Sequence, residues 1–178
     1  NCLSDILDWI NPALNDHHKQ VALIALRMAD ALDLPIVEQN EIVCAGILHD
    51  VGAISLAERM ETMNYEYSNG EYHAEMGYQL INIFEPMQRA AELIRFHHTP
   101  WAQGKGRYHK DQTVPLGSRI LVLADRIALL VNKKAGILGQ VESIKQRILD
   151  TGDTMFEPRL IDVFLELAEK EYFWLDLV

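Results

Sequence analysis

The stretch that decides the fold is "AGILHDVGAIS", residues 45–55. It reads as an apolar helix until an imidazole and a carboxylate, His49 and Asp50, interrupt it side by side. An unpaired carboxylate is costly to bury, because its charge loses water and gains no partner. The pair therefore lies either at an exposed helix end or beside something that neutralises it, and a metal ion is one such partner.

The hydrophobic pattern around this stretch has a helical period nearly throughout the chain. We find no internal repeat and no convincing strand pattern, so we predict an all-α, single-domain helical bundle of about seven to eight helices. A loop opens at Pro100 and reaches to about Pro115. The predicted helices cover residues 4–10, 16–33, 38–50, 71–84, 86–98, 117–132, 139–150 and 158–173.

Composition limits the class of protein. A chain of 178 residues, 49% hydrophobic, fits one domain over residues 1–178. The net charge of −10 argues against a nucleic-acid polymer as partner. There is no membrane-length apolar run and no signal peptide, so we expect a cytoplasmic domain without membrane contact. The two cysteines make no disulfide framework, and Cys44 is predicted to be a small core residue. Because the chain begins with Asn, we expect it to be part of a longer protein.

One segment runs against the overall charge. Residues 99–134 hold seven basic and two acidic side chains, a net charge of +5, which leaves −15 for the rest. Such a segment is either a solvated basic face or a landing site for a small anionic ligand. If it is a landing site, the side chains that we expect to contact phosphate are Lys105, Arg107, Arg126 and Lys133.

Seven ligand-type side chains fall on the apolar faces of five predicted helices, because residues three, four or seven apart share a helix face. A single inward histidine is usually a core residue with one hydrogen bond. Five imidazoles and two carboxylates together are too costly to bury, and a shared cation resolves them all. His18 and His109 lie off this pattern. The predicted ligands in the bundle core are His17, His49, Asp50, His73, His97, His98 and Asp125.

The set of ligand atoms narrows the choice of metal ion. Five nitrogens and two carboxylates are too many for one tetrahedral zinc ion. They suit two octahedral first-row ions that share a carboxylate, and Asp50 is the natural bridge. Two such ions polarise a phosphate oxygen and make hydroxide available at neutral pH, which is the chemistry of phosphoester hydrolysis.

The order His, His-Asp, His, His-His, Asp resembles the HD superfamily of metal-dependent phosphohydrolases. The paired histidines at 97–98 and "VPLGSRILVLAD" (114–125) are similar to its HD-GYP branch, as is "GDTMFEPRLIDVF" (152–164). The resemblance covers about residues 13–168. It implies hydrolysis of cyclic di-GMP by a site with iron or manganese, a catalytic role for Asp50, and a sensor or receiver domain in the parent chain. It assigns His17, His49 and Asp125 to one ion and His73, His97 and His98 to the other, with Asp50 between them.

The chain departs from the family pattern at several positions. The family's "HDxGK" is "HDVGA" here, so Ala53 replaces a lysine that is expected to contact phosphate. The GYP motif is reduced to Gly104, Gly106 and Tyr108. The extra acidic ligand of some members falls at Ala13, so no third metal is expected.

Two interpretations stay open. One is a two-metal phosphodiesterase of weakened activity, acting on a cyclic dinucleotide or on other nucleotides. The other is a non-enzymatic, metal-stabilised module that senses or docks. The intact ligand set favours the enzyme, whereas Ala53 and the broken motif favour the module.

Overall fold

The computed structural model describes residues 16–177 apart from 63 and 66–69. The described part is all-α, as predicted; the predicted helix at 4–10 lies outside it. Within the described ranges, three short 3-10 helices join the longer elements: η2 (Glu85–Met87), η3 (Ala102–Arg107) and η4 (Ile137–Gln140). The α-helices are α2 (His17–Ala31), α3 (Ile36–Leu48), α4 (Leu56–Thr62), α5 (Glu71–Asn82), α6 (Gln88–Arg95), α7 (Leu116–Leu130), α8 (Val141–Met155), α9 (Pro158–Ala168) and α10 (Glu171–Leu175).

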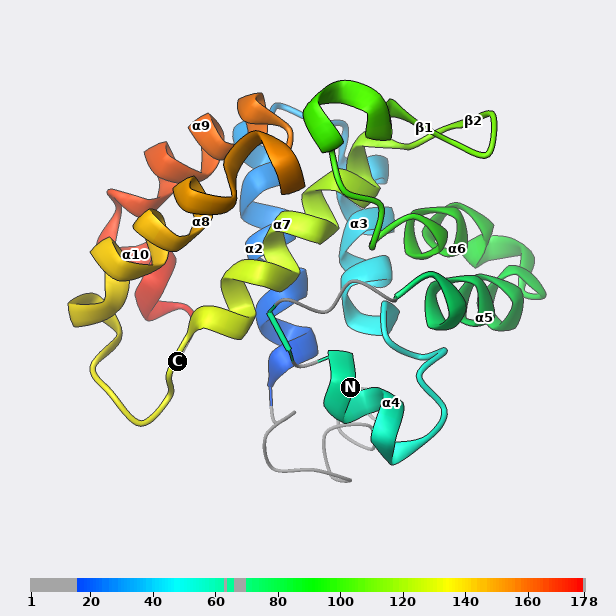
Figure 1. Cartoon of the computed structure of the whole chain (residues 1–178), viewed down its shortest axis with the longest axis horizontal. Helices are drawn as coiled ribbons and strands as arrows, with labels where there is room; N and C mark the ends of the chain where they lie inside the picture. The colour runs from blue at the N-terminus through cyan, green and yellow to red at the C-terminus, as the bar shows by residue number, and fades with distance from the viewer. Residues whose placement is uncertain (1–15, 63, 66–69, 178) are drawn as a thin grey trace.

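Three helices form the centre of the molecule. Figure 1 shows α2, α3 and α7 side by side, with α5 and α6 on one flank and α8, α9 and α10 on the other. Helix α7, "LGSRILVLADRIALL", is buried on nearly every face. A helix that is apolar all round must be enclosed by others, so its sequence places it at the centre. Asp125 and Arg126 are therefore carried into the interior by the most buried helix of the fold.

The flank formed by α8, α9 and α10 closes the hydrophobic core. Phe164, Phe173 and Trp174 are almost completely buried, and they pack together with ring centroids 5.1–6.3 Å apart. The indole nitrogen of Trp174 donates to the carbonyl of Ala168 at 2.8 Å, so the polar end of this large side chain is satisfied where it is buried. This flank carries none of the predicted metal ligands and serves as the scaffold behind α2 and α7.

The structure differs from the sequence prediction at several points. Helix α4 was not predicted, and the single helix expected at 158–173 is divided into α9 and α10. The expected loop at 100–115 contains η3 and a small antiparallel hairpin, β1 (Tyr108–His109) with β2 (Gln112–Thr113), in which Tyr108 pairs with Thr113.

The prediction for Cys44 was wrong, because its side chain is exposed. Helix α3 buries Ile42, Ala45 and Gly46, and Cys44 falls on the opposite face. The helix is apolar on both faces, so hydrophobicity alone did not reveal which face is turned inward. Among the described residues, no helix is both long and apolar enough to cross a membrane.

Candidate metal centre

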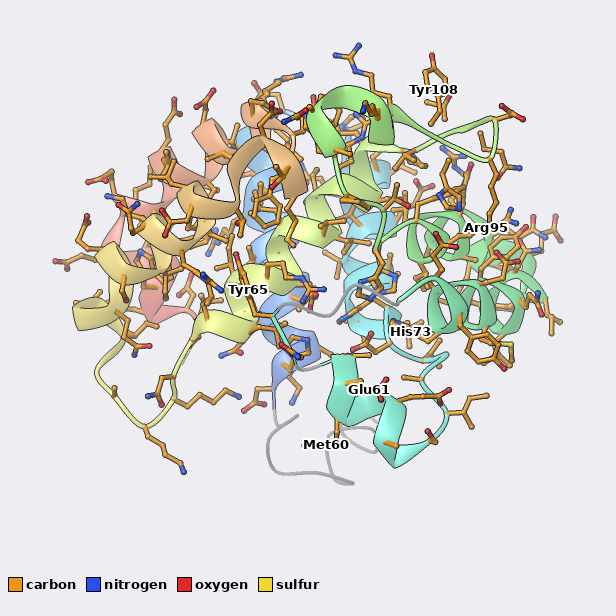
Figure 2. All side chains as sticks on the ribbon, in the orientation of Figure 1. Met60, Glu61, Tyr65, His73, Arg95 and Tyr108 are labelled. Atoms are coloured by element: carbon orange, nitrogen blue, oxygen red, sulfur yellow. The ribbon has the colours of Figure 1, made fainter. Side chains whose placement is uncertain are left out.

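The structure brings all seven predicted ligands together at one point between the helices. His17 begins α2, His49 and Asp50 follow α3, and His73 lies in the first turn of α5, where Figure 2 labels it. The remaining three lie just after α6 and within α7: His97, His98 and Asp125. Six of the seven are buried and His98 is half-buried, so the cluster lies inside the bundle as predicted.

Asp50 is the member that both halves of the cluster share. One group of potential metal ligands consists of Asp50 with His73, His97 and His98, and the other of Asp50 with His17 and His49. Its Oδ1 lies 3.2 Å from Nε2 of His73, whereas its Oδ2 lies 3.3 Å from Nε2 of His49. The two oxygens of one carboxylate thus face two different sets of histidines, which is the arrangement of a bridging ligand.

In each of the two groups, the distances between the other ligand atoms fit a single metal ion that the group shares. Nε2 of His73 lies 3.0 Å from Nε2 of His98 and 3.4 Å from Nε2 of His97. On the other side, Oδ1 of Asp125 lies 3.1 Å from Nε2 of His17. Ligands at about 2.1 Å from one ion lie roughly 3.0–3.4 Å from each other, so these separations are those of neighbouring ligands.

Whether a cation fits the site can be tested by asking which buried ligand atoms lack a hydrogen-bond partner. Among the described residues, Nε2 of His17, Nε2 of His49 and Oδ1 of Asp50 are buried and have no hydrogen-bond partner. Their short distances to other polar atoms lack the alignment of a hydrogen bond. Leaving such atoms without a partner costs about 1–3 kcal/mol each, which a cation among them removes. The donor set therefore fits metal ions.

Two of the histidines are held in the orientation that metal binding requires. Nδ1 of His49 lies 2.9 Å from the carbonyl oxygen of Gly46, and Nδ1 of His97 lies 2.6 Å from that of Ile94. A carbonyl only accepts, so Nδ1 carries the proton and donates it. The lone pair is then on Nε2, which points into the cluster, as in most histidine ligands of metals.

The electrostatic field of the cluster also suits cations. Burial raises the pKa of Asp50 and of Asp125, but His49 beside the first and Arg126 beside the second hold both pKa values well below their usual range. Burial lowers the pKa of His49, but the two carboxylates raise it well above its usual value overall. Burial, with His97 and His73 nearby, lowers the pKa of His98. Both carboxylates are therefore charged at neutral pH and can bind cations.

Two glycines allow the helices that carry His73 and Asp50 to meet. After α3 the chain makes a tight turn in which the amide of Ala53 donates to the carbonyl of Asp50 at 3.0 Å. Within this turn, a Cβ on Gly52 would overlap the carbonyl oxygen of His73 and the amide nitrogen of Gly77. The backbone contact between Gly52 and Gly77 thus sets the distance between α3 and α5, and with it the distance from Asp50 to His73.

We expect Gly52→Ala to weaken both the fold and the metal site. The added methyl group must push α5 away from α3, and overpacking of this kind costs roughly 1–3 kcal/mol. Thermal unfolding should show a lower Tm, and elemental analysis should show less bound metal. Gly139→Ala is the matched control, because nothing lies within 4 Å of the Cβ that it adds. Equal metal content in Gly52→Ala and Gly139→Ala would contradict the role given to the Gly52–Gly77 contact.

One further histidine, which was not among the predicted ligands, belongs to the cluster region. His18 is buried, and its ring centroid lies 5.5 Å from that of His17 and 5.3 Å from that of His49. It follows His17 directly on α2, whose buried surface also includes Gln20, bonded to the carbonyl of Leu177 at 2.7 Å. The helix is thus enclosed on more than one face, and the narrow apolar stripe in its sequence gave no sign of this.

The four predicted phosphate contacts lie in different places. Arg126 lies in the cluster region, with Nη2 3.5 Å from Nδ1 of His98. Lys105 and Arg107 are on η3, which packs against α8, and the Arg107 guanidinium lies 5.2 Å from the centre of the Trp101 ring. Lys133 follows α7, with Nζ 3.8 Å from Oδ2 of Asp16. The structure therefore brings Arg126 to the metal ligands and places Lys105 and Arg107 on another element.

The residues that remain of the GYP motif also lie away from the metal ligands. Tyr108 begins the small hairpin, and its side chain is 65% exposed. Figure 2 shows it projecting outward, away from His73. Gly106 is buried, and a Cβ there would overlap the carbonyl oxygen of Pro100. In this chain the motif therefore shapes the η3 turn.

Comparison with known proteins identifies the family of the chain. Residues 1–145 match the family model of the HD domain. A 3'3'-cGAMP-specific phosphodiesterase from Vibrio cholerae is 25% identical over 184 aligned positions, which cover 99% of this chain and 42% of the relative. A cyclic di-GMP phosphodiesterase from Thermotoga maritima is 24% identical over 180 positions, covering 96% of this chain and 48% of the relative. The chain spans less than half the length of these two relatives. The match confirms the predicted relationship: the chain belongs to the HD domain family.

Proposed function

We propose that this chain is a metal-dependent phosphodiesterase domain that hydrolyses a cyclic dinucleotide, cyclic di-GMP in the first place, with weakened activity. The observation that carries the proposal is Asp50, whose two carboxylate oxygens face two separate groups of buried histidines. The names of the two relatives support a cyclic dinucleotide as the substrate class. We further propose that residues 1–178 form one HD-type domain of a longer cytoplasmic signalling protein with a sensor or receiver domain.

The cofactors that we propose are two divalent first-row ions, iron or manganese. His17, His49 and Asp125 would hold one ion and His73, His97 and His98 the other, with Asp50 contributing one oxygen to each. When bound, the ions would polarise a phosphate oxygen and make hydroxide available at neutral pH.

The chain's own residues make the site selective for an anion. The histidines are neutral when they bind metal, so the carboxylates of Asp50 and Asp125 neutralise only half the charge of two divalent ions. The positive charge that remains attracts a phosphodiester. Lys105, Arg107 and Lys133 remain our candidates for contacts to parts of the substrate farther from the metals.

A turnover assay tests the proposal. The purified chain, loaded with Mn²⁺ or Fe²⁺, should contain about two ions per molecule, as a bridged pair requires. It should open cyclic di-GMP or 3'3'-cGAMP to the linear dinucleotide slowly, and a chelator should abolish this activity. Ordinary nucleoside triphosphates and linear dinucleotides serve as comparison substrates. Faster hydrolysis of these would move the proposed substrate class to other nucleotides.

The second candidate function is a metal-stabilised sensing or docking module. The observation that favours it is Ala53, which leaves the position one turn after Asp50 without the lysine of the family pattern. A chain that binds two ions and hydrolyses none of these substrates would contradict the first function and favour this second one.

A further inference from the structure

The region of the metal cluster contains one buried charge that does not belong to the ligand set, the guanidinium of Arg126. This residue follows Asp125 on α7 and is only 2% exposed. A guanidinium stays protonated in proteins, and a buried charge is costly unless it is paired and hydrogen-bonded. The partners that Arg126 contacts therefore indicate its role.

Arg126 connects three parts of the site. Its Nη1 donates to the backbone carbonyls of Asn64 at 2.9 Å and Tyr65 at 2.8 Å. Its Nη2 lies 3.5 Å from Nδ1 of His98, and its Nε lies 3.6 Å from Oδ2 of Asp125. One rigid, planar group thus joins the backbone after α4 to Asp125 in one half of the metal centre, and it lies beside His98 in the other half.

The side chain of Tyr65 is itself held in place by contacts with α8. The Tyr65 hydroxyl lies 3.0 Å from Oγ1 of Thr151, and its ring lies near two guanidinium carbons, 4.9 Å from that of Arg147 and 6.0 Å from that of Arg126. Figure 2 shows Tyr65 beside α7, reaching toward α8. Tyr65, whose carbonyl accepts from Arg126, is therefore anchored to α8 through its hydroxyl group.

We propose that Arg126 is a positioning residue that holds Asp125, through their ion pair, in the geometry that its half of the metal centre requires, and that it does not bind the substrate phosphate. This replaces the sequence-based assignment of Arg126 as a phosphate contact. It rests on the proposed function only in that the cluster binds metal. Two of the five N–H bonds of Arg126 are directed at backbone carbonyls, and the group is withdrawn from solvent.

The test compares Arg126→Met and Arg126→Lys with the unmodified protein. Calorimetric titration of the metal-free chain with Mn²⁺ should show about 10- to 100-fold weaker binding for Arg126→Met, as for other groups that orient ligands. With a cyclic dinucleotide, kcat should fall while KM changes little. Arg126→Lys should lie between the two, because one ammonium cannot bond both carbonyls and also stay beside Asp125.

Arg119→Met is the matched control, since Arg119 is a partly buried arginine on the same helix. It bonds Glu157 at 2.8 Å and the carbonyl of Val114 at 2.9 Å, and so contacts neither half of the cluster through these groups. This variant should lower the Tm and leave Mn²⁺ affinity unchanged. Arg126→Met that behaves the same way, or that raises KM at unchanged Mn²⁺ affinity, overturns the proposal.

Tyr65→Phe and Arg126→Lys together keep the test decisive if Arg126→Met does not fold. Tyr65→Phe removes the hydroxyl contact with Thr151 and should weaken Mn²⁺ binding only a few-fold, in the same direction as Arg126→Lys. Unchanged Mn²⁺ affinity in both variants overturns the proposal. If the unmodified chain binds Mn²⁺ without hydrolysing any cyclic dinucleotide, the proposed function fails, but the affinity comparison still decides the role of Arg126.

Discussion

Replacing Asp50 by alanine is expected to empty most of the metal centre and to abolish measurable hydrolysis of a cyclic dinucleotide. Oδ1 of Asp50 faces His73 and His97, whereas Oδ2 faces His49, so this change removes a ligand from both proposed ions at once. The rate should fall by more than the roughly 10²–10³-fold that follows removal of a single transition-state donor. Elemental analysis and a turnover assay on the same preparation measure the two effects.

Variants that lack a ligand from only one half of the cluster give the comparison that this prediction needs. His17→Ala and His73→Ala each remove a donor from one half of the cluster and should leave more metal bound than Asp50→Ala. Asp162→Ala, at an exposed carboxylate on α9, controls for loss of a charge and should change neither metal content nor rate. If His73→Ala strips the site while Asp50→Ala leaves it full, the bridging assignment is wrong.

Much of the fold could be predicted because helical periodicity is a local property of the sequence. The strongly patterned helices α2, α5 and α7 lie within a few residues of their predicted ranges. Helix α4 was missed because it is only seven residues long and has no long apolar stripe. The break between α9 and α10 was missed because the pattern continues through it, although the chain turns there to bury Phe173 and Trp174.

The convergence of the predicted ligands could also be foreseen, for a related reason. Each ligand shares a helix face with apolar residues, and those faces must meet in the core. The partners of Arg126 could not be foreseen, because they are backbone carbonyls at Asn64 and Tyr65 that only tertiary packing brings to α7. The placement of η3 against α8 is likewise a tertiary contact, which the basic charge of Lys105 and Arg107 did not reveal.

The second large effect is expected at Ala53, where a lysine should raise the rate on a cyclic dinucleotide. The amide of Ala53 bonds the carbonyl of Asp50, so residue 53 lies one turn after the proposed bridging ligand. An ammonium there would donate to a phosphate oxygen as charge develops on it. One such donor is worth roughly 10²–10³ in rate, so Ala53→Lys should gain up to this factor.

Ala53→Met separates the charge of the lysine from its bulk. Ala53 is completely buried, so either long side chain must displace neighbouring atoms, and both variants should be less stable by roughly 1–3 kcal/mol. The methionine adds a similar stem without an ammonium, so it should lower the Tm and leave the rate unchanged. A rate gain in Ala53→Lys alone therefore measures the charge.

The opposite result would also be informative. If Ala53→Lys retains two bound ions and hydrolyses no faster than Ala53→Met, then the lost lysine is not what limits turnover. The limiting change must then lie elsewhere in the substrate site, and the 99–114 segment is the best candidate, because its motif is degenerate and its Tyr108 points outward. That segment folds as η3, which packs against α8, followed by a hairpin. Restoring activity would therefore require rebuilding its backbone, and the sensing or docking module would become the better proposal.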